Sequence, residues 1–383
     1  MLSPLLLVAA LVAVVRAILM PGPIGAFPVA MRTHELTDGS RNDPYAPHNG
    51  THLRRILVSV FLPLDPVQYG DAEIQQLPYM PPLTAAEYSR LAQIISPFFE
   101  AVFEKLAIEY RRLETIDRGR EHATKKKSYP VVLFSPGLGG SRLMYSAGAR
   151  DLASQGYVVI TIDHPYDASI VEFPDGSFVR GVNFSTTAQI AAATKVRVQD
   201  VLFLVNQLYD SEVLGRLTEG FPGLVNVKKM AMYGHSLGGA TAAEALRRDS
   251  RLLGGMNWDG EMQGEAASQG LVQPFVQVGT PDHRHQNNSN WPAFYKKLRG
   301  PKLELEVKNT THISFTDLPL LLSTMEVPDE AQPSLKHFLG TVSGRRLRRT
   351  LTGILKASLE FVFERNGEDV GRLAEDYCGL TVV

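Results

Sequence analysis

The sequence has little of what marks several common classes of protein. It contains one cysteine, Cys378, among 383 residues, which excludes a disulfide within the chain and a cysteine-based zinc site. The 40 acidic and 39 basic side chains nearly balance, and a net charge of −1 gives no general attraction to nucleic acid. The sequence also lacks an EF-hand loop, a His-Glu-x-x-His motif and a phosphate-binding glycine motif. We therefore expect a protein that uses no metal or other cofactor and binds no nucleic acid.

Long apolar runs are also scarce, and the run near the N-terminus is short. Leu5–Val15 is uninterrupted, whereas a membrane-spanning helix needs about 20 apolar residues. Val15–Ala17 then offers small residues around a cleavage point. This pattern predicts a signal peptide over residues 1–17 and a secreted mature protein. Sequons for N-glycosylation, which fit a secreted protein, occur at Asn49, Asn183, Asn287 and Asn309.

Beyond residue 127, short apolar segments alternate with segments of helical pattern. The expected strands are 131–134, 157–162, 229–233, 253–258, 274–279 and 303–307. The expected helices are 144–154, 187–208, 239–247 and 344–363. Such alternation is typical of an α/β fold, with a mostly parallel sheet and helices on both faces. We expect residues 18–383 to form one such domain.

The segment before residue 127 has a different pattern. Residues 21–47 are rich in Pro, Gly and Asp, which predicts a loop, and the β-rich residues 55–62 predict a strand. Residues 77–127 are predicted to form a helical insertion, with a helix over 85–118. Apolar side chains recur there at helical spacing, at Phe99, Phe103, Leu106, Tyr110 and Leu113. Packing against the domain is the simpler interpretation of this stripe, and contact with a lipid surface is the alternative.

A G-x-S-x-G motif spans Gly234–Gly238, with Ser236 at its centre. A predicted strand precedes the motif and a predicted helix of small residues follows it, which is the context of a nucleophile elbow in the α/β-hydrolase fold. Glycines on both sides allow a tight turn that exposes the serine above a helix N-terminus, where developing negative charge is favoured. Ser236 is therefore the predicted nucleophile of an α/β hydrolase.

A glycine-rich turn, Ser135–Ser141, follows the predicted strand 131–134. The α/β-hydrolase fold places one backbone donor of its oxyanion hole in this turn and the other directly after the nucleophile. The predicted donors are the N–H groups of Leu138 and Leu237. One such donor is worth about 3–4 kcal/mol in the transition state.

The acid and the base of the triad should follow the serine in that order. Two acids compete, because Asp259 ends the strand 253–258 and Asp282 ends the next strand, which is the commoner position in the fold. Four histidines follow Asp259, at His283, His285, His312 and His337. The first two lie too close to the second acid to occupy a separate loop, and the last precedes the final helix. His312 follows the last predicted strand and is the predicted base.

Several stretches together resemble the secreted, plasma-type platelet-activating factor acetylhydrolases. They are RRILVSVFLPLD at Arg54–Asp65, VVLFSPGLGGSRLMYSAGARDLASQGYVVITIDH at Val131–His164, YGHSLGGAT at Tyr233–Thr241, NWDG at Asn257–Gly260 and THISFTDLP at Thr311–Pro319. The resemblance implies that Ser236 is the nucleophile, Asp259 the acid and His312 the base, so it favours Asp259 over Asp282. It also implies the oxyanion donors Leu138 and Leu237.

The same resemblance implies calcium-independent hydrolysis of a short sn-2 acyl ester of a phospholipid. A general carboxylesterase or polyester hydrolase is the alternative within the same chemistry, because related folds act on many esters. A non-catalytic lipid-binding protein on a hydrolase scaffold is the alternative of another class. The partners expected on any of these views are a phospholipid or other ester and, peripherally, a lipid surface.

The predicted C-terminal helix offers a second candidate for such lipid contact. It opens with four arginines and then presents an apolar stripe, a combination typical of interfacial helices. Packing of the stripe on the sheet, with a solvated basic end, is the simpler interpretation. The residues concerned are Arg345, Arg346, Arg348 and Arg349, followed by Leu351, Ile354, Leu355, Leu359 and Val362.

Overall fold

The computed structural model describes residues 17–47, 50–116, 126–281, 283–284, 289–364, 373, 375, 377 and 379–383. Most of the predicted signal peptide, residues 1–16, lies outside this part of the chain. The same holds for five residues named above, which are Asn49, Asp282, His285, Asn287 and Cys378.

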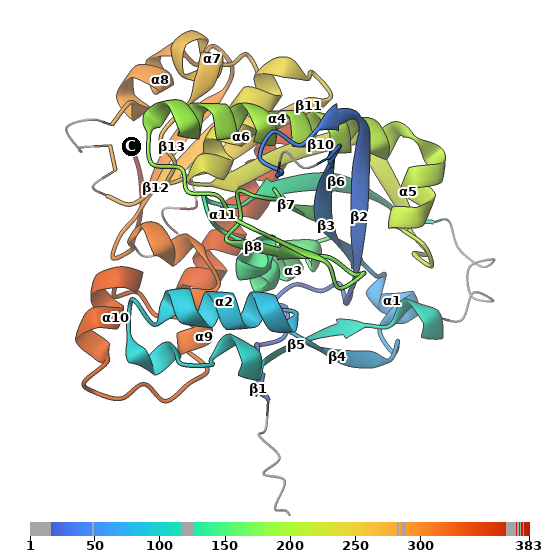
Figure 1. The fold of residues 1–383 in the computed structure, drawn as a ribbon, viewed down its shortest axis with the longest axis vertical. Coiled ribbons are helices and arrows are strands. Elements are labelled where there is room, and N and C mark those ends of the chain that lie inside the picture. The colour runs from blue at the N-terminus through green and yellow to red at the C-terminus, as the bar shows by residue number, and fades with distance from the viewer. Residues whose placement is uncertain are drawn as a thin grey trace, which may run out of the picture.

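Within the described residues, one 12-stranded sheet runs through the molecule in the order β1-β5-β2-β3-β7-β6-β10-β11-β12-β13-β14, with β4 paired to β5 (Figure 1). Strands β6, β7 and β10 to β13 are parallel, whereas β3 pairs antiparallel with β2 and β7, and β14 pairs antiparallel with β13. The bounds are β1 Ile18–Leu19, β2 Val29–Asn42, β3 Leu53–Pro63, β4 Ile74–Pro78, β5 Leu106–Arg111, β6 Ser128–Ser135, β7 Val158–Asp163, β10 Leu224–His235, β11 Leu252–Trp258, β12 Phe275–Gly279, β13 Lys302–Val307 and β14 Leu380–Val382. A small hairpin, β8 Ile170–Glu172 and β9 Phe178–Arg180, lies apart from this sheet.

Helices cover both faces of the sheet. Helices α4 and α6 pack with their side chains in one buried apolar cluster, and α3 and α11 in the other. The bounds are α1 Pro66–Tyr69, α2 Pro82–Ala92, α3 Ser146–Ala153, α4 Thr187–Tyr209, α5 Ser211–Leu217, α6 Leu237–Arg248, α7 Gly264–Gln269, α8 Trp291–Lys297, α9 Leu318–Leu322, α10 Gln332–Leu339 and α11 Gly344–Glu364. In the described part of the chain, no helix is long and apolar enough to cross a membrane.

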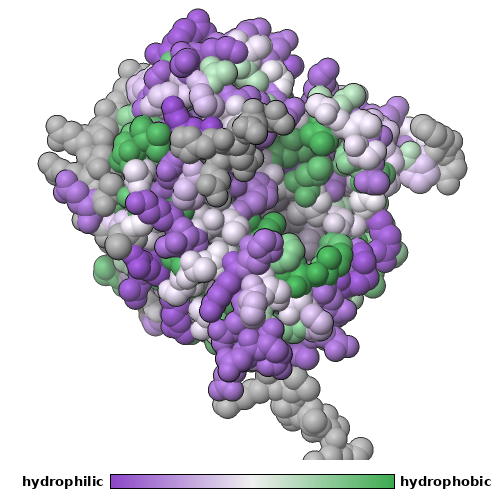
Figure 2. Space-filling view, turned by 90° about the vertical axis from the view of Figure 1, so that its left-hand side faces the viewer, coloured by the Kyte–Doolittle hydropathy of each residue, from purple (hydrophilic) through white to green (hydrophobic). Residues whose placement is uncertain are grey.

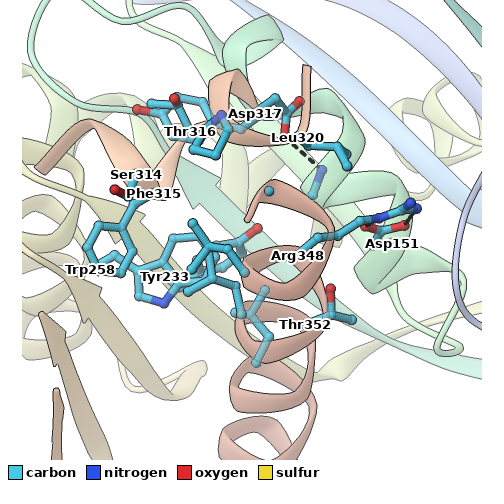
Figure 3. Close-up of a pocket in the computed structure, with 17 residues that line it drawn as sticks. Asp151, Tyr233, Trp258, Ser314, Phe315, Thr316, Asp317, Leu320, Arg348 and Thr352 are labelled. Carbon is cyan, nitrogen blue, oxygen red and sulfur yellow. Dashed lines mark hydrogen bonds and ion pairs between the residues drawn. The ribbon is translucent and has the colours of Figure 1, made fainter. Parts of the chain in front are cut away.

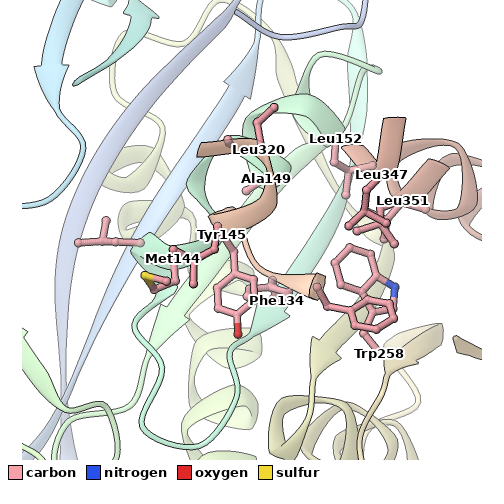
Figure 4. Close-up of a cluster of buried hydrophobic side chains, with 14 of the residues drawn as sticks. Phe134, Met144, Tyr145, Ala149, Leu152, Trp258, Leu320, Leu347 and Leu351 are labelled. Atoms are coloured by element: carbon pink, nitrogen blue, oxygen red, sulfur yellow. The ribbon is translucent and has the colours of Figure 1, made fainter. Parts of the chain in front are cut away.

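The central strands are apolar on both faces because both faces are covered. In β6, Val131 and Leu133 point into the cluster beneath α4 and α6, while Val132 and Phe134 point into the cluster beneath α3 and α11. Figure 4 shows Phe134 in this second cluster, with residues of α3 and α11 such as Leu152 and Leu351. The predicted α/β fold with helices on both faces is confirmed.

Two predictions for the N-terminal region are wrong. Residues 21–47 contain the 14-residue strand β2, which pairs with β3 over nearly its whole length. The polar residues of this segment suggested a loop. However, β2 is only partly buried, and a partly buried strand accommodates both polar and apolar side chains. Buried and exposed positions alternate along only part of β2. The sequence therefore lacks the regular alternation of apolar and polar residues that would have predicted a strand.

The predicted helical insertion over 77–127 is also wrong in its second half. Helix α2 ends at Ala92, two short 3-10 turns follow at Pro97–Phe99 and Phe103–Lys105, and β5 then joins the main sheet. Pro97 interrupts a continuing helix, since proline lacks a backbone donor and clashes with the preceding turn. The apolar residues at helical spacing are all buried, but from separate turns and a strand, so the periodicity was coincidental.

Candidate active site

The G-x-S-x-G motif forms a sharp turn between β10 and α6. Ser236 has φ 56° and ψ −123°, a backbone conformation that non-glycine residues rarely adopt and that is typical of functional sites. A Cβ atom on Gly234 would lie 2.2 Å from the backbone of Gly238, and one on Gly238 would lie 2.0 Å from the carbonyl oxygen of Ser135. Both glycines are therefore required by close backbone contacts, and the turn holds the Ser236 side chain at the carboxyl edge of the sheet.

Asp259 and His312 meet at the same edge. Asp259 directly follows β11, and His312 begins the 3-10 turn His312–Phe315 after β13. His312 Nδ1 lies 2.7 Å from Asp259 Oδ2. An ionised carboxylate only accepts hydrogen bonds, so Nδ1 carries the proton and Nε2 of the neutral ring is left to accept one.

The environment of Asp259 favours its charged form. Burial opposes ionisation, but hydrogen bonds from His283 and His312 outweigh it and hold the pKa of Asp259 well below its usual range. The Asp259 side chain is 2% exposed, whereas that of His312 is 46% exposed. The acid is therefore fixed in the interior, and the histidine reaches from it to the surface where Ser236 lies.

The turn after β6 holds a backbone donor toward this site. The N–H of Gly139 donates to Asp167 Oδ1 at 3.3 Å, and that of Gly140 donates to the Gly137 carbonyl at 3.0 Å. Within the described residues, the N–H of Leu138 has no such acceptor. Leu237 is the first residue of α6, so its N–H has no acceptor within the helix either. The N–H groups of both predicted oxyanion donors are thus available to bind a substrate oxygen.

Buried Arg197 fixes the carbonyl groups of the same turn. Its guanidinium donates to the Gly137 carbonyl at 3.0 Å, to the Pro136 carbonyl at 2.5 Å and to Asp167 at 2.7 Å. With the carbonyls turned toward Arg197, the intervening amides face the other way. The sequence did not reveal this role, because Arg197 lies mid-helix in α4 with no motif around it.

The candidate site opens onto two depressions of different character. One, of about 310 Å³, is largely apolar. Its lining includes Ser236 and His312 together with Tyr88, Leu91, Ile95, Phe103, Met144 and Leu318. The other, of about 580 Å³, is more polar. Its lining includes Ser236, His312, Glu261, Gln263, Thr280 and Thr311. An ester bound at Ser236 therefore has an apolar side and a polar side available for its two halves.

A smaller enclosed cavity of about 40 Å³ lies behind the site, between α11 and the segment that carries His312. Figure 3 shows Tyr233, Trp258 and Phe315 on one side of it and the ion pair of Arg348 with Asp151 on the other. Ser236 does not line this cavity, and its volume is too small for a substrate.

The two segments considered for lipid contact are packed in the interior. Phe99, Phe103, Leu106 and Tyr110 are at most 3% exposed. The apolar stripe of α11 is buried as well, and Arg348 at its start is paired with Asp151. Packing is therefore the correct interpretation of both stripes. The face drawn in Figure 2 shows apolar surface only as separate patches among hydrophilic residues.

One histidine contact at this site was not predicted from the sequence. His283, rejected as too close to the strand before it, contacts Asp259 Oδ1 through Nδ1 at 3.0 Å. It follows β12, where its N–H donates to the Thr280 carbonyl at 3.1 Å, and no local pattern signals its contact with Asp259. Asp282 lies outside the described residues, while Asp259 makes the contact with His312 that the resemblance implied.

A second Ser–His–Asp constellation lies beneath the turn after β6. Ser135 Oγ is 3.0 Å from His164 Nε2, and His164 Nδ1 is 2.9 Å from Asp200 Oδ2. All three side chains are at most 1% exposed. We call Ser135, His164 and Asp200 the buried array, and Ser236, His312 and Asp259 the candidate triad. Within the described residues, no group of three or more His, Cys, Asp or Glu is placed to hold a metal ion.

A sequence model of one protein family matches this chain over residues 48–174 and 197–328, and its description is platelet-activating factor acetylhydrolase, isoform II. The chain belongs to this family. The matched segments contain the turn with Leu138 and all three residues of the candidate triad.

Relatives with names agree with this family. A probable 1-alkyl-2-acetylglycerophosphocholine esterase of Arthroderma benhamiae is 31% identical over 318 residues, covering 79% of this chain and 77% of the relative. A platelet-activating factor acetylhydrolase of Cavia porcellus is 27% identical over 214 residues, covering 50% and 49%. Among solved structures, a ferulic acid esterase from Streptomyces cinnamoneus is similar with a TM-score of 0.74 and 26% identity, covering 95% of this chain and 99% of that one.

Proposed function

We propose that this protein is a serine esterase that hydrolyses the short sn-2 acyl ester of phospholipids of the 1-alkyl-2-acetylglycerophosphocholine type. The observation that carries the proposal is the 2.7 Å contact of His312 with buried Asp259, at the sheet edge where the strained elbow holds Ser236. The name of the Arthroderma benhamiae relative and the family supply the substrate class.

The chemistry follows from these positions. His312 Nε2 takes the Ser236 proton as Oγ attacks the ester carbonyl, and it then gives that proton to the departing alcohol. Asp259 holds the histidine tautomer and stabilises the imidazolium. The N–H groups of Leu138 and Leu237 stabilise the oxyanion. Water hydrolyses the acyl-enzyme by the same route, so we expect full activity in excess EDTA.

Hydrolysis of an acetyl phospholipid and of a soluble aryl ester, with wild type and Ser236→Ala, tests this proposal. We expect the phospholipid to be the better substrate by kcat/KM and both activities to vanish in the variant. Turnover by folded Ser236→Ala would contradict the mechanism, and a clear preference for the aryl ester would contradict the substrate class.

A general carboxylesterase or polyester hydrolase is the second candidate. Two observations favour it, namely the similarity to a ferulic acid esterase and an apolar depression of about 310 Å³, which is larger than an acetyl group requires. Phospholipids with graded sn-2 chains distinguish the two. Rates that fall steeply beyond short chains favour the phospholipid esterase, and flat rates across phospholipids and unrelated esters favour the general one.

We also propose that the rim of the apolar depression contacts the lipid surface that presents the substrate. Ile94 adjoins Ile95 of the lining and is 75% exposed, and Leu138 in the lining is 38% exposed. Ile94→Asp should lower activity on vesicles but not on monomeric ester. Val67→Asp is the matched control, because Val67 is 92% exposed on α1 and neither it nor its chain neighbours line the depression. Equal losses in both variants would contradict the proposal.

Secretion is the remaining proposal. The apolar run at the N-terminus supports it, and the sequon residues Asn183 and Asn309 are exposed, as acceptor sites must be. Expression of the full chain in a secreting cell, followed by N-terminal sequencing and deglycosylation of the medium fraction, tests it. An uncleaved protein retained in the cytosol would contradict it.

A further inference from the structure

Asp259 contacts a second histidine, His283, which has no role in the proposed reaction. His312 Nδ1 faces Oδ2 of the carboxylate at 2.7 Å, and His283 Nδ1 faces Oδ1 at 3.0 Å. Thr280 also donates to Oδ1, from its N–H at 2.9 Å and its hydroxyl at 3.2 Å. The two carboxylate oxygens are thus divided, one for the predicted base and the other for a fixed set of donors.

His283 is itself held in place. Its side chain is 8% exposed, and its ring packs on that of buried Trp291 with centroids 4.3 Å apart. Trp291 is in turn anchored by its Nε1–H, which donates to the Gly260 carbonyl at 2.7 Å. The second ring nitrogen of His283 lies 3.2 Å from Glu261 Oε1, an ion-pair distance, although its N–H is not aligned for a hydrogen bond.

This arrangement favours a charged imidazole. Burial opposes protonation, but the carboxylates of Asp259 and Glu261 outweigh it and raise the pKa of His283 to about 9. Burial likewise opposes ionisation of Glu261, and the contact with His283 holds the pKa of Glu261 below its usual value. A positive charge therefore lies between two negative ones next to the predicted base.

We propose that His283 is a positioning residue of the active site, which binds Oδ1 of Asp259 so that Oδ2 faces His312 and which offsets part of the carboxylate charge. The inference rests on the proposed function in one respect, since it takes Ser236, Asp259 and His312 as the reacting groups. A merely structural histidine would stabilise the turn but would not alter the protonation of the base.

Within the described residues, His235 and Arg284 are further charged or titratable groups next to the two histidines. His235 at the end of β10 packs against the ring of His312, with centroids 4.5 Å apart. Burial lowers the pKa of His235 to about 3, so it stays neutral in the working range. Arg284, next to His283, is paired with Glu304 of β13. His283 and Glu261 are therefore the groups expected to set the electrostatic potential at His312.

The decisive variant is His283→Asn. An asparagine amide can take the place of Nδ1 as a donor to Asp259, but it carries no charge. The net charge beside His312 becomes more negative, which favours the protonated form of the base. As the pH is lowered, the variant should therefore lose activity at a higher pH than the wild type does. We expect the acidic limb of the kcat/KM profile to move up by about one pH unit, with kcat reduced about tenfold or less.

His283→Ala removes the donor as well as the charge. Its kcat should fall further than that of His283→Asn, by about 100-fold, because Asp259 is then free to turn. Thr280→Val is the matched control, since it removes a neutral donor from the same oxygen and changes no charge. The acidic limb of its kcat/KM profile should lie at the same pH as in the wild type.

The outcomes separate the two proposals. A shifted limb in His283→Asn, with an unshifted limb in Thr280→Val, supports the inference. An unshifted limb in folded His283→Asn, or equal shifts in both variants, overturns it. Activity in Ser236→Ala would instead overturn the proposed function. A nitrogen-15 NMR titration of the wild-type histidines needs no variant, and a neutral His283 at pH 7 would also overturn the inference.

Discussion

The buried array and the candidate triad are built from the same three side-chain types, a serine, a histidine and an aspartate. In both, an aspartate accepts from histidine Nδ1, at 2.9 Å in the buried array and 2.7 Å in the candidate triad. Ser135 Oγ also accepts from Arg197 at 3.3 Å, so its own hydroxyl proton is free to point at His164 Nε2. The hydrogen-bond polarity of the buried array is therefore that of a serine hydrolase.

The two constellations differ in access, backbone and charge. The buried array is shielded from solvent, and Ser135 ends the regular strand β6, whereas Ser236 sits on a strained turn beside two depressions. Burial opposes ionisation of Asp200, but Arg54 outweighs it and holds the pKa of Asp200 below its usual range. Burial also lowers the pKa of His164, although Asp200 opposes this. The buried array therefore lacks the access to substrate that hydrolysis requires.

The sharpest contrast is between the two aspartates. Asp259→Asn should lower kcat by about 10⁴-fold, because the amide favours the wrong histidine tautomer. Asp282→Asn is the control, since that residue was the alternative acid. Steady-state kinetics on an acetyl ester measure both. A larger loss in Asp282→Asn would show that the acid had been assigned to the wrong strand.

Asp200→Asn should have the opposite effect. It removes the buried carboxylate that pairs with His164 and one of the two that pair with Arg54, the other being Asp43. Breaking a buried pair of this kind typically costs about 3–5 kcal/mol of stability. The rate per active site, normalised by titration with an organophosphate, should stay within about threefold of wild type. Urea unfolding measures the first quantity. A stable variant with a crippled rate would mean that the buried array takes part in chemistry.

Asp200 should also make stability depend on pH. Its folded pKa lies below the unfolded value of 3.8, so its contribution is complete above that value and is lost as pH falls below it. The free energy of unfolding of wild type should therefore drop more steeply below about pH 4 than that of Asp200→Asn. Parallel curves for the two proteins would exclude Asp200 as a source of acid sensitivity.

The smallest effect is expected for Ser135→Ala. The variant loses one buried hydroxyl and its hydrogen bonds, which should cost about 1–2 kcal/mol of stability. Its kcat should stay within about twofold of wild type, because Arg197 still binds the Pro136 and Gly137 carbonyls and keeps the turn after β6 in place. A much lower kcat in a folded variant would assign Ser135 a role at the oxyanion hole.

The same comparison shows what the sequence can predict. Ser236, Leu237 and the α/β fold follow from local pattern, because an elbow needs its glycines next to the serine and a strand before it. The contacts of Asp259 with His312 and of His164 with Asp200 depend on how distant strands align. The resemblance to a family supplied the first of these contacts, and nothing in the local sequence supplied the second or the contact of His283.

Covalent labelling tests the central claim most directly. The full-length protein is treated with a fluorophosphonate at neutral pH, and the modified peptide is identified by mass spectrometry. We expect one adduct, on Ser236, formed in step with loss of esterase activity, and no adduct on the solvent-shielded Ser135. An adduct on Ser135, or undiminished labelling of folded Ser236→Ala, would contradict it.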